Sequence, residues 1–222
     1  NFSFGVAVSG AGDHDADGLP DLLLGHPTVA LPGHFGWGAV RIHSGRDGAL
    51  LREIGPSVGD TSFGYRVCEA GDLDHDGHPD VLAMVFGSAA GSGVATAGRV
   101  YSGATGLVLL NVPVDPAVGS KSSVPACSRD IDQDGFPDYV IGTPQAGVNG
   151  VNSGRVRVLS GQSGAVLFVF DGSAPGELLG SSVACADVNG DGFGDIVAGA
   201  PGASVAGQPS KGLVRVYSGA DG

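Results

Sequence analysis

A nine-residue acidic segment occurs four times along the chain at nearly constant spacing, and this repetition restricts the possible folds more than any other feature. The copies begin at Asp13, Asp72, Asp130 and Asp187, so successive starts lie 59, 58 and 57 residues apart. A second motif, Ser-Gly-x-x-Gly, begins at Ser44, Ser102, Ser160 and Ser218, always 58 residues apart. Two motifs with one period predict four copies of one structural unit, at about residues 1–58, 59–116, 117–174 and 175–222.

Short apolar runs separated by glycine and proline predict that each repeat consists of β-strands. A first strand precedes the acidic segment, as at residues 63–67, and a second follows it, at residues 21–25, 81–85, 139–142 and 196–199. A third alternates apolar residues with arginine, at residues 40–43, 156–159 and 214–217. A fourth follows the Ser-Gly motif, at residues 50–54, 107–110 and 166–170, and the last repeat ends before this outer strand.

The composition supports an all-β fold with many tight turns. Glycine accounts for 41 of the 222 residues, and it readily adopts the positive φ angles that turns need. Four antiparallel strands in about 58 residues correspond to one blade of a propeller, which buries both faces only by stacking against neighbouring blades. We therefore predict an all-β fold, a β-propeller built of four-stranded antiparallel blades, with a single propeller domain or part of one over residues 1–222.

The acidic segment has the pattern D-x-[DN]-x-[DN]-G-x-x-D, which predicts a loop that binds a hard cation. Oxygen ligands at positions 1, 3 and 5 converge when the backbone curls, glycine at position 6 permits the sharp turn, position 7 offers its backbone carbonyl, and the aspartate at position 9 completes the shell. Calcium prefers such oxygen ligands, whereas zinc and copper favour thiolate or imidazole. A simpler alternative is that the aspartates only cap their own backbone in Asx turns, but this does not explain the fixed spacing.

The prediction is up to four Ca²⁺ ions, one in each repeat. The predicted ligands, including the position 7 carbonyls, are Asp13, Asp15, Asp17, Leu19 and Asp21; Asp72, Asp74, Asp76, His78 and Asp80; Asp130, Asp132, Asp134, Phe136 and Asp138; and Asp187, Asn189, Asp191, Phe193 and Asp195.

The net charge narrows the range of partners. The net charge of −12 argues against binding to nucleic acid or to anionic membrane surfaces.

The three cysteines, Cys68, Cys127 and Cys185, are interpreted as small buried hydrophobic residues, with one disulfide plus a free thiol as the alternative. No apolar run is long enough for a transmembrane helix, and no signal peptide is visible. Because the chain begins at Asn1, we expect a mature form or an excised segment.

Phe-Gly, an acidic loop and Gly-x-Pro follow one another within a repeat, and this order resembles the FG-GAP repeats of integrin α subunits and of many bacterial surface proteins. The pairs of flanking motifs are Phe4-Gly5 with Gly25-His26-Pro27, Phe63-Gly64 with Gly87-Ser88-Ala89, Lys121-Ser122-Ser123 with Gly142-Thr143-Pro144, and Leu179-Gly180 with Gly199-Ala200-Pro201. The resemblance implies calcium in the turn between the first two strands of each blade. The loss of Phe-Gly in the third repeat leaves the packing of that blade open, but not its metal loop.

The resemblance also implies a ring of seven blades, whereas this chain has four repeats. Three completions remain open: a fragment of a larger propeller, a ring completed by a second copy or another chain, and a four-bladed ring with one thin blade. An unpaired outer edge in the last blade favours pairing with another chain.

Catalytic motifs are missing from the sequence: there is no G-x-S-x-G elbow, no H-E-x-x-H and no P-loop. Most acids belong to the acidic loops, and Glu53, Glu69 and Glu177 are scattered, so we predict that the chain is not an enzyme.

The predicted function is an extracellular calcium-binding module for protein interaction, adhesion or scaffolding, with mainly structural calcium. Sites with a Kd of about 0.1 mM would be empty at cytosolic calcium concentrations, which places the protein outside the cell. The alternatives are the propeller of a secreted polysaccharide lyase or phospholipase, and a lectin.

We predict that the loops between the second and third strands form the recognition face for a protein or glycan, because such loops gather at one rim of a propeller. They cover residues 87–98, 145–153 and 202–212, and in the first repeat they carry His26, His34, Phe35 and Trp37, for which packing is favoured over binding. His14 and His75 lie between the ligand positions of the acidic loops, and His78 lies at position 7, which offers only its carbonyl. We expect all three side chains to face solvent.

Overall fold

The computed structural model describes residues 5–33, 37–57, 60–85, 98–112, 124–127, 129–205, 208 and 210–222. Within these ranges every regular element is a β-strand, and no described segment is a helix long and apolar enough to cross a membrane. The chain divides into two compact units, Asn1–Val114 and Asp115–Gly222, each with two antiparallel sheets. The predicted all-β fold of antiparallel propeller blades is confirmed.

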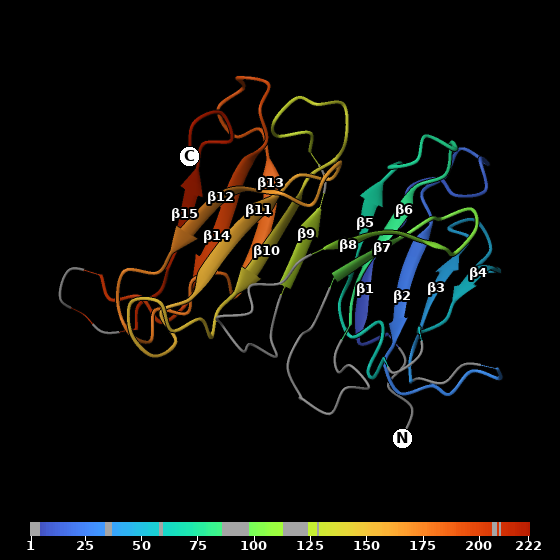
Figure 1. The fold of residues 1–222 in the computed structure, drawn as a ribbon, viewed down its shortest axis with the longest axis horizontal. Helices are drawn as coiled ribbons and strands as arrows, with labels where there is room; N and C mark the ends of the chain where they lie inside the picture. The colour runs from blue at the N-terminus through green and yellow to red at the C-terminus, as the bar shows by residue number, and fades with distance from the viewer. Residues whose placement is uncertain are drawn as a thin grey trace. The chain divides into compact units, whose positions relative to one another are not determined.

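The first unit contains the blades of the first two repeats, drawn in blue to green in Figure 1. The first blade has the order β1-β2-β3-β4 and the second the order β5-β6-β7-β8, so each blade is a simple meander. The strands are β1 (Ala7–Gly10), β2 (Leu22–His26), β3 (Ala39–His43), β4 (Leu50–Ile54), β5 (Val67–Gly71), β6 (Asp80–Met84), β7 (Gly98–Tyr101) and β8 (Val108–Val112).

The second unit contains the blades of the third and fourth repeats, of which the fourth has three strands in its described residues. The order is β9-β10-β11-β12 in one sheet and β13-β14-β15 in the other. The strands are β9 (Val124–Cys127), β10 (Tyr139–Thr143), β11 (Arg155–Leu159), β12 (Val166–Asp171), β13 (Ser182–Ala186), β14 (Asp195–Ala200) and β15 (Leu213–Tyr217).

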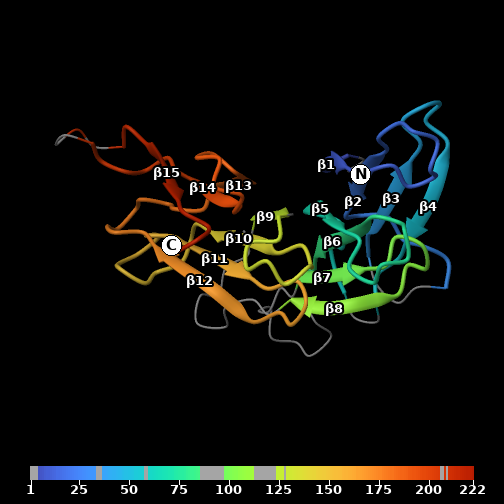
Figure 2. The same ribbon diagram turned by 90° about the horizontal axis from the view of Figure 1, so that it is seen from above.

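Neighbouring blades within a unit pack face to face. Strand β5 contacts β1 and β2 in the first unit, and β13 contacts β9 and β10 in the second, as Figures 1 and 2 show. Val156 and Val158 of β11 form a buried cluster with residues of β14 such as Ile196, and both valines are 0% exposed. The equivalent residues of the fourth blade, Val214 and Val216, are 67% and 53% exposed. The face that receives the following blade is therefore covered in the third blade and open in the fourth.

The FG-GAP motif is explained by contacts between successive blades. A Cβ atom on Gly25, the glycine of Gly-His-Pro in the first repeat, would overlap the carbonyl oxygen of Gly64, which belongs to Phe-Gly in the second repeat. Gly142 and Gly180 meet in the same way in the second unit. Glycine is needed at both positions because the two backbones touch.

Two expectations about the second blade are corrected. A strand was expected at residues 63–67, but β5 begins at Val67 because Gly64 turns the chain at a φ of 81°, while Phe63 forms an isolated parallel bridge with Gly38. The interpretation of the cysteines as unpaired hydrophobic residues is wrong for Cys68, which is buried but disulfide-bonded. Cys185 has a free, half-buried thiol, so the chain follows the alternative of a disulfide plus a free thiol.

Candidate metal centres

Each acidic loop curls through left-handed backbone at two positions. The glycine at position 6 has a positive φ in all four loops, with values of 87°, 89°, 94° and 90° for Gly18, Gly77, Gly135 and Gly192. Position 4 is also left-handed, at 59° for Ala16, 57° for His75, 59° for Gln133 and 78° for Gly190. A left-handed non-glycine residue costs roughly 1 kcal/mol, so the loop needs compensating bonds.

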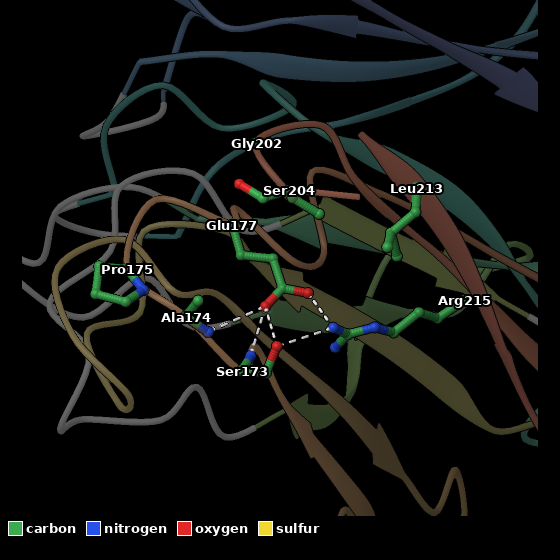
Figure 3. A pocket seen from close by; sticks show the side chains of 9 residues that line it. Ser173, Ala174, Pro175, Glu177, Gly202, Ser204, Leu213 and Arg215 are labelled. Carbon is green, nitrogen blue, oxygen red and sulfur yellow. Dashed lines mark hydrogen bonds and ion pairs between the residues drawn. The ribbon is translucent and has the colours of Figure 1, made fainter. Parts of the chain in front are cut away.

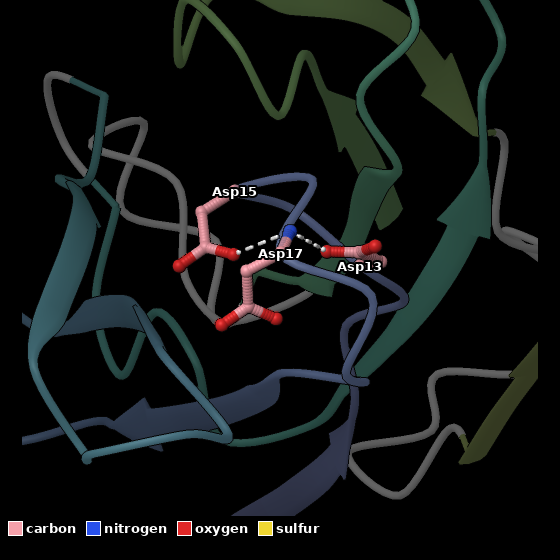
Figure 4. A group of neighbouring side chains, drawn as sticks. All are labelled: Asp13, Asp15 and Asp17. Atoms are coloured by element: carbon pink, nitrogen blue, oxygen red, sulfur yellow. Dashed lines mark hydrogen bonds between the residues drawn. The ribbon is translucent and has the colours of Figure 1, made fainter.

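The aspartate at position 1 supplies two of these bonds. Asp13 accepts the N–H of Asp17 on Oδ1 at 3.0 Å and the N–H of Gly18 on Oδ2 at 2.9 Å, and Figure 4 shows Asp17 N–H pointing between Asp13 and Asp15. The same pair of bonds is made by Asp72, Asp130 and Asp187. The repeated geometry shows that the spacing of the motif encodes one loop conformation.

Positions 3 and 5 make the Asx-type bonds of the simpler alternative. Asp15 Oδ1 accepts from the N–H of Asp17 at 3.2 Å, and Asp17 Oδ1 accepts from the N–H of Leu19 at 2.9 Å. The equivalent bonds occur in the other three loops, where the N–H groups of His78, Phe136 and Phe193 donate to position 5. Because these bonds use only one oxygen of each position 3 or 5 carboxylate, Asx capping and cation binding are compatible.

Carboxylates converge in three of the loops. Ligand atoms lie within 4.8 Å of one another in the groups Asp13, Asp15 and Asp17; Asp72, Asp74 and Asp80; and Asp130, Asp132 and Asp138. In the fourth loop Asn189 replaces an aspartate, and its amide donates to Asp191 Oδ2 at 2.9 Å. An all-oxygen set of this kind fits a hard cation such as Ca²⁺.

The aspartate at position 9 is a buried link between the acidic loop and the Ser-Gly turn. Asp80, which is 1% exposed, accepts the N–H of Leu73 on Oδ2 at 2.7 Å and the N–H of Gly103 on Oδ1 at 2.9 Å. Asp21, Asp138 and Asp195 make equivalent bonds across 24, 23 and 24 residues to the glycine of the Ser-Gly motif. This link explains why the two sequence motifs keep one spacing.

The glycine whose N–H donates this bond has no room for a side chain in three of the blades. A Cβ atom on Gly45 or Gly103 would overlap the carbonyl oxygen of Pro20 or Pro79, at position 8 of the acidic loop, and one on Gly219 would overlap that of Gly194. In these three blades the loop and the turn therefore pack backbone against backbone, at the end of the blade where the second strand begins and the third strand ends.

Burial changes the proton affinity of two linking aspartates. Burial raises the pKa of Asp80 and of Asp138 to about 6, although the N–H groups that they accept act in the opposite direction. In the last described blade the balance differs, because the N–H bonds from Gly219 and Val188 lower the pKa of Asp195. A divalent cation beside Asp80 or Asp138 would offset the cost of their buried charge.

The first loop has an arginine as an additional neighbour. Arg46 Nε lies 2.5 Å from Asp17 Oδ2, and Arg46 Nη2 donates to the carbonyl oxygen of Asp17 at 3.0 Å. Hydrogen bonding to Arg46 lowers the pKa of Asp17, and the same bond raises the pKa of Arg46. The sequence contained the signal, an arginine inside one of four Ser-Gly motifs, but did not indicate that the two motifs touch.

The histidines of the acidic loops are not all exposed as expected. His75 is exposed, but His14 is 6% exposed and lies against Gly103 in the next blade. His78 is half-buried, and its Nδ1 lies 2.9 Å from the carbonyl oxygen of His14. Ile131, at the same position of the third loop, belongs to the buried cluster that the third and fourth blades share, so position 2 takes a packing role in both loops.

Glu177, which the sequence left without a role, is a buried structural acid. It is 2% exposed, pairs with Arg215 of β15, and accepts the N–H and hydroxyl of Ser173 on Oε2 at 2.5 and 2.9 Å. These groups line a cavity of about 100 Å³, shown in Figure 3. Asp60 and Arg99 form a similar pair at 2.5 Å in the first unit, which joins the segment before β5 to β7.

The expected recognition loops are described only in part. Residues 145–153 are described, with Val151 77% exposed, whereas residues 87–97 and His34 and Phe35 lie outside the described residues. Trp37 is 56% exposed, so the expectation that it packs is wrong. Its N–H donates to the Asp60 carbonyl at 3.2 Å and its own carbonyl accepts from Phe63 at 3.0 Å, bonds that fix the backbone and leave the indole in solvent.

Two family models and several relatives of similar sequence agree with this architecture. A model of the FG-GAP repeat matches residues 126–159 and 179–217, and a model of the FG-GAP-like repeat matches residues 13–83. The chain is 32% identical to integrin alpha-5 of Xenopus laevis over 90% of its length, and 30% identical to integrin alpha-IIb of Homo sapiens over 91%. It spans 20% of the length of each of these relatives. A solved structure of the Dos1 propeller aligns to 89% of the chain and covers 44% of its own, with 12% identity and a TM-score of 0.45. From the two family models and the four repeated blades, we conclude that this chain belongs to the FG-GAP repeat family of β-propeller proteins.

Proposed function

We propose that the chain is a calcium-stabilised interaction module, in which the four acidic loops each bind one Ca²⁺. The observation that carries the proposal is the convergence of carboxylate oxygens in three loops, together with the left-handed backbone at positions 4 and 6 that all four loops share. The proposed side-chain ligands are those at positions 1, 3, 5 and 9, and the backbone carbonyls of Leu19, His78, Phe136 and Phe193 complete the sets. Bound calcium would neutralise carboxylates that otherwise repel one another at the end of each blade.

The proposed role of calcium is structural. Each loop connects the first two strands of a blade, and its position 9 aspartate reaches the turn between the third and fourth strands, so a filled loop holds all four strands together. A site filled tenfold above its Kd gains about 1.4 kcal/mol. Four such sites would together supply an appreciable part of a domain stability of about 5–15 kcal/mol. Sites of this affinity would fill at millimolar calcium, so we propose an extracellular location. We also propose that residues 1–222 form a single propeller domain or part of one.

A protein partner is the proposed ligand, as in an adhesion or scaffold role. Similarity to integrin α subunits supports this choice, and so does the exposed indole of Trp37 on a fixed backbone, because exposed aromatic anchors contribute strongly to protein interfaces. A glycan array with and without calcium tests the choice. Calcium-dependent glycan binding that Trp37→Ala abolishes would instead assign a lectin function.

Calcium binding is tested by thermal unfolding and light scattering in millimolar calcium and in excess EGTA. We expect a lower melting temperature after chelation, and a smaller difference for Asp134→Asn, which alters a proposed ligand. Asp47→Asn is the matched control, because Asp47 caps the N–H of Ala49 at 2.9 Å outside the acidic loops. A melting temperature that does not respond to calcium in any variant would refute the proposal.

A further inference from the structure

The first acidic loop differs from the others in having a cationic side chain of its own. Both oxygens of Asp17 are engaged by protein groups, since Oδ2 pairs with Arg46 Nε at 2.5 Å and Oδ1 accepts the N–H of Leu19 at 2.9 Å. Arg46 also donates to the backbone carbonyl of Asp17 at 3.0 Å. A cation that uses Asp17 as a ligand must therefore compete with this guanidinium.

The repeats provide matched positions without this competitor. Arg46 is the third residue of its Ser-Gly-x-x-Gly motif, and the same place holds Ala104, Gln162 and Ala220 in the other motifs. The third loop has the same four aspartates at positions 1, 3, 5 and 9 and the same backbone bonds as the first. The first and third loops therefore share ligand residues and backbone bonds, but differ in the charge that the neighbouring turn presents to position 5.

We propose that Arg46 makes the first loop a weak calcium site that keeps its conformation without the metal, so that the chain contains cation sites of two kinds. This inference rests on the proposed calcium binding. A guanidinium beside the ligand carboxylate repels Ca²⁺ and removes part of its attraction, which lowers affinity on the order of three- to tenfold at an exposed site. In the absence of calcium the same guanidinium relieves repulsion among the carboxylates, a role that no side chain of the third Ser-Gly motif can fill.

A reciprocal exchange between two repeats tests the inference. The Arg46→Gln variant gives the first turn the residue of the third, and Gln162→Arg places arginine in the third turn, where Gln162 is exposed. Hydrogen–deuterium exchange of the full chain, followed by mass spectrometry across free calcium from about 10 μM to about 10 mM, reports the protection of residues 13–21 and 130–138 separately.

We expect the first loop of the unaltered chain to gain protection at a calcium concentration on the order of three- to tenfold above that of the third loop. Arg46→Gln should remove the difference, and Gln162→Arg should raise the concentration that the third loop needs. In EGTA the unaltered first loop should exchange more slowly than the third, and Arg46→Gln should abolish this protection.

Equal calcium responses of the two loops in the unaltered chain and in both variants would overturn the inference while leaving calcium binding intact. A chain in which neither loop responds to calcium would overturn the proposed calcium binding, and this inference with it. If Arg46→Gln does not fold, the response of the third loop in Gln162→Arg decides the question, because the unaltered chain supplies its reference.

Discussion

Replacing Asp138 with alanine should destabilise the chain whether or not calcium is present. The Asp138 carboxylate is 0% exposed and accepts backbone N–H groups from Ile131, Asp132 and Gly161 at 2.6, 3.2 and 2.9 Å. Alanine leaves these donors without their acceptor in a position that water reaches poorly. Each lost bond to a charged acceptor is worth about 1.5–3 kcal/mol before the cost of burying the charge is subtracted, so we expect a net loss of about 3–4 kcal/mol.

The matched variant is Asp132→Ala in the same loop. Asp132 is exposed, and its side chain accepts one N–H, from Asp134 at 3.2 Å, so its removal should cost little in EGTA. In calcium it should lose the contribution of the bound ion as well. Urea unfolding followed by circular dichroism, in saturating calcium and in excess EGTA, measures both differences. If Asp138→Ala loses less than about 1 kcal/mol in EGTA, the aspartate at position 9 acts only through the metal and our reasoning is refuted.

Three further predictions follow from burial, backbone strain and proton affinity. Val158→Ala should lower the free energy of unfolding in urea by about 1–3 kcal/mol, because Val158 is fully buried. Val216→Ala, at the equivalent exposed position of the fourth blade, should change it by less than about 0.5 kcal/mol. Equal losses in the two variants would contradict the packing described. Gln133→Gly should raise stability by about 0.5–1 kcal/mol, because Gln133 is exposed at a φ of 59°, and a loss of stability would show that the side chain makes a needed contact. Because burial raises the pKa of Asp80 and Asp138 to about 6, the folded metal-free chain holds protons that the unfolded chain releases at lower pH. The contribution of these two aspartates to stability in EGTA should therefore fall as the pH rises from about 4 to 6. The increase in melting temperature on adding calcium should be larger at about pH 7 than at about pH 5. Thermal scans at a series of pH values measure this increase, and a larger increase at the lower pH would contradict the reasoning.

The period of the acidic segments was sufficient to predict most of the fold. Strand β4 has the predicted bounds, β3 and β10 differ from prediction by one residue at one end, and β2 is shifted by one residue at both ends. This success follows from the turn glycines, whose positions limit where each strand can begin and end. The start of β5 was misplaced because a short apolar run does not reveal that Gly64 lies against the backbone of Gly25 in the preceding blade.

The site was predicted as a set of ligands but not as a packed structure. The position 9 aspartates were expected as metal ligands, and their burial and their bonds to the Ser-Gly turn depend on contacts across 23 or 24 residues that no local pattern contains. The Arg46 pair and the burial of His14 arise from the same kind of contact. The left-handed backbone at position 4 had one sequence signal, Gly190 in the fourth loop, whereas Ala16 and Gln133 conceal it.

The link between the position 9 aspartate and the Ser-Gly turn has a consequence for engineering. It fixes the start of the second strand against the end of the third, and the connection between those strands leaves from the opposite end of the blade. Foreign peptides inserted between residues 147 and 152 would therefore leave every acidic loop in place. A blade with constant chemistry at one end and a tolerant loop at the other is the arrangement that a display library requires, and the third blade offers it.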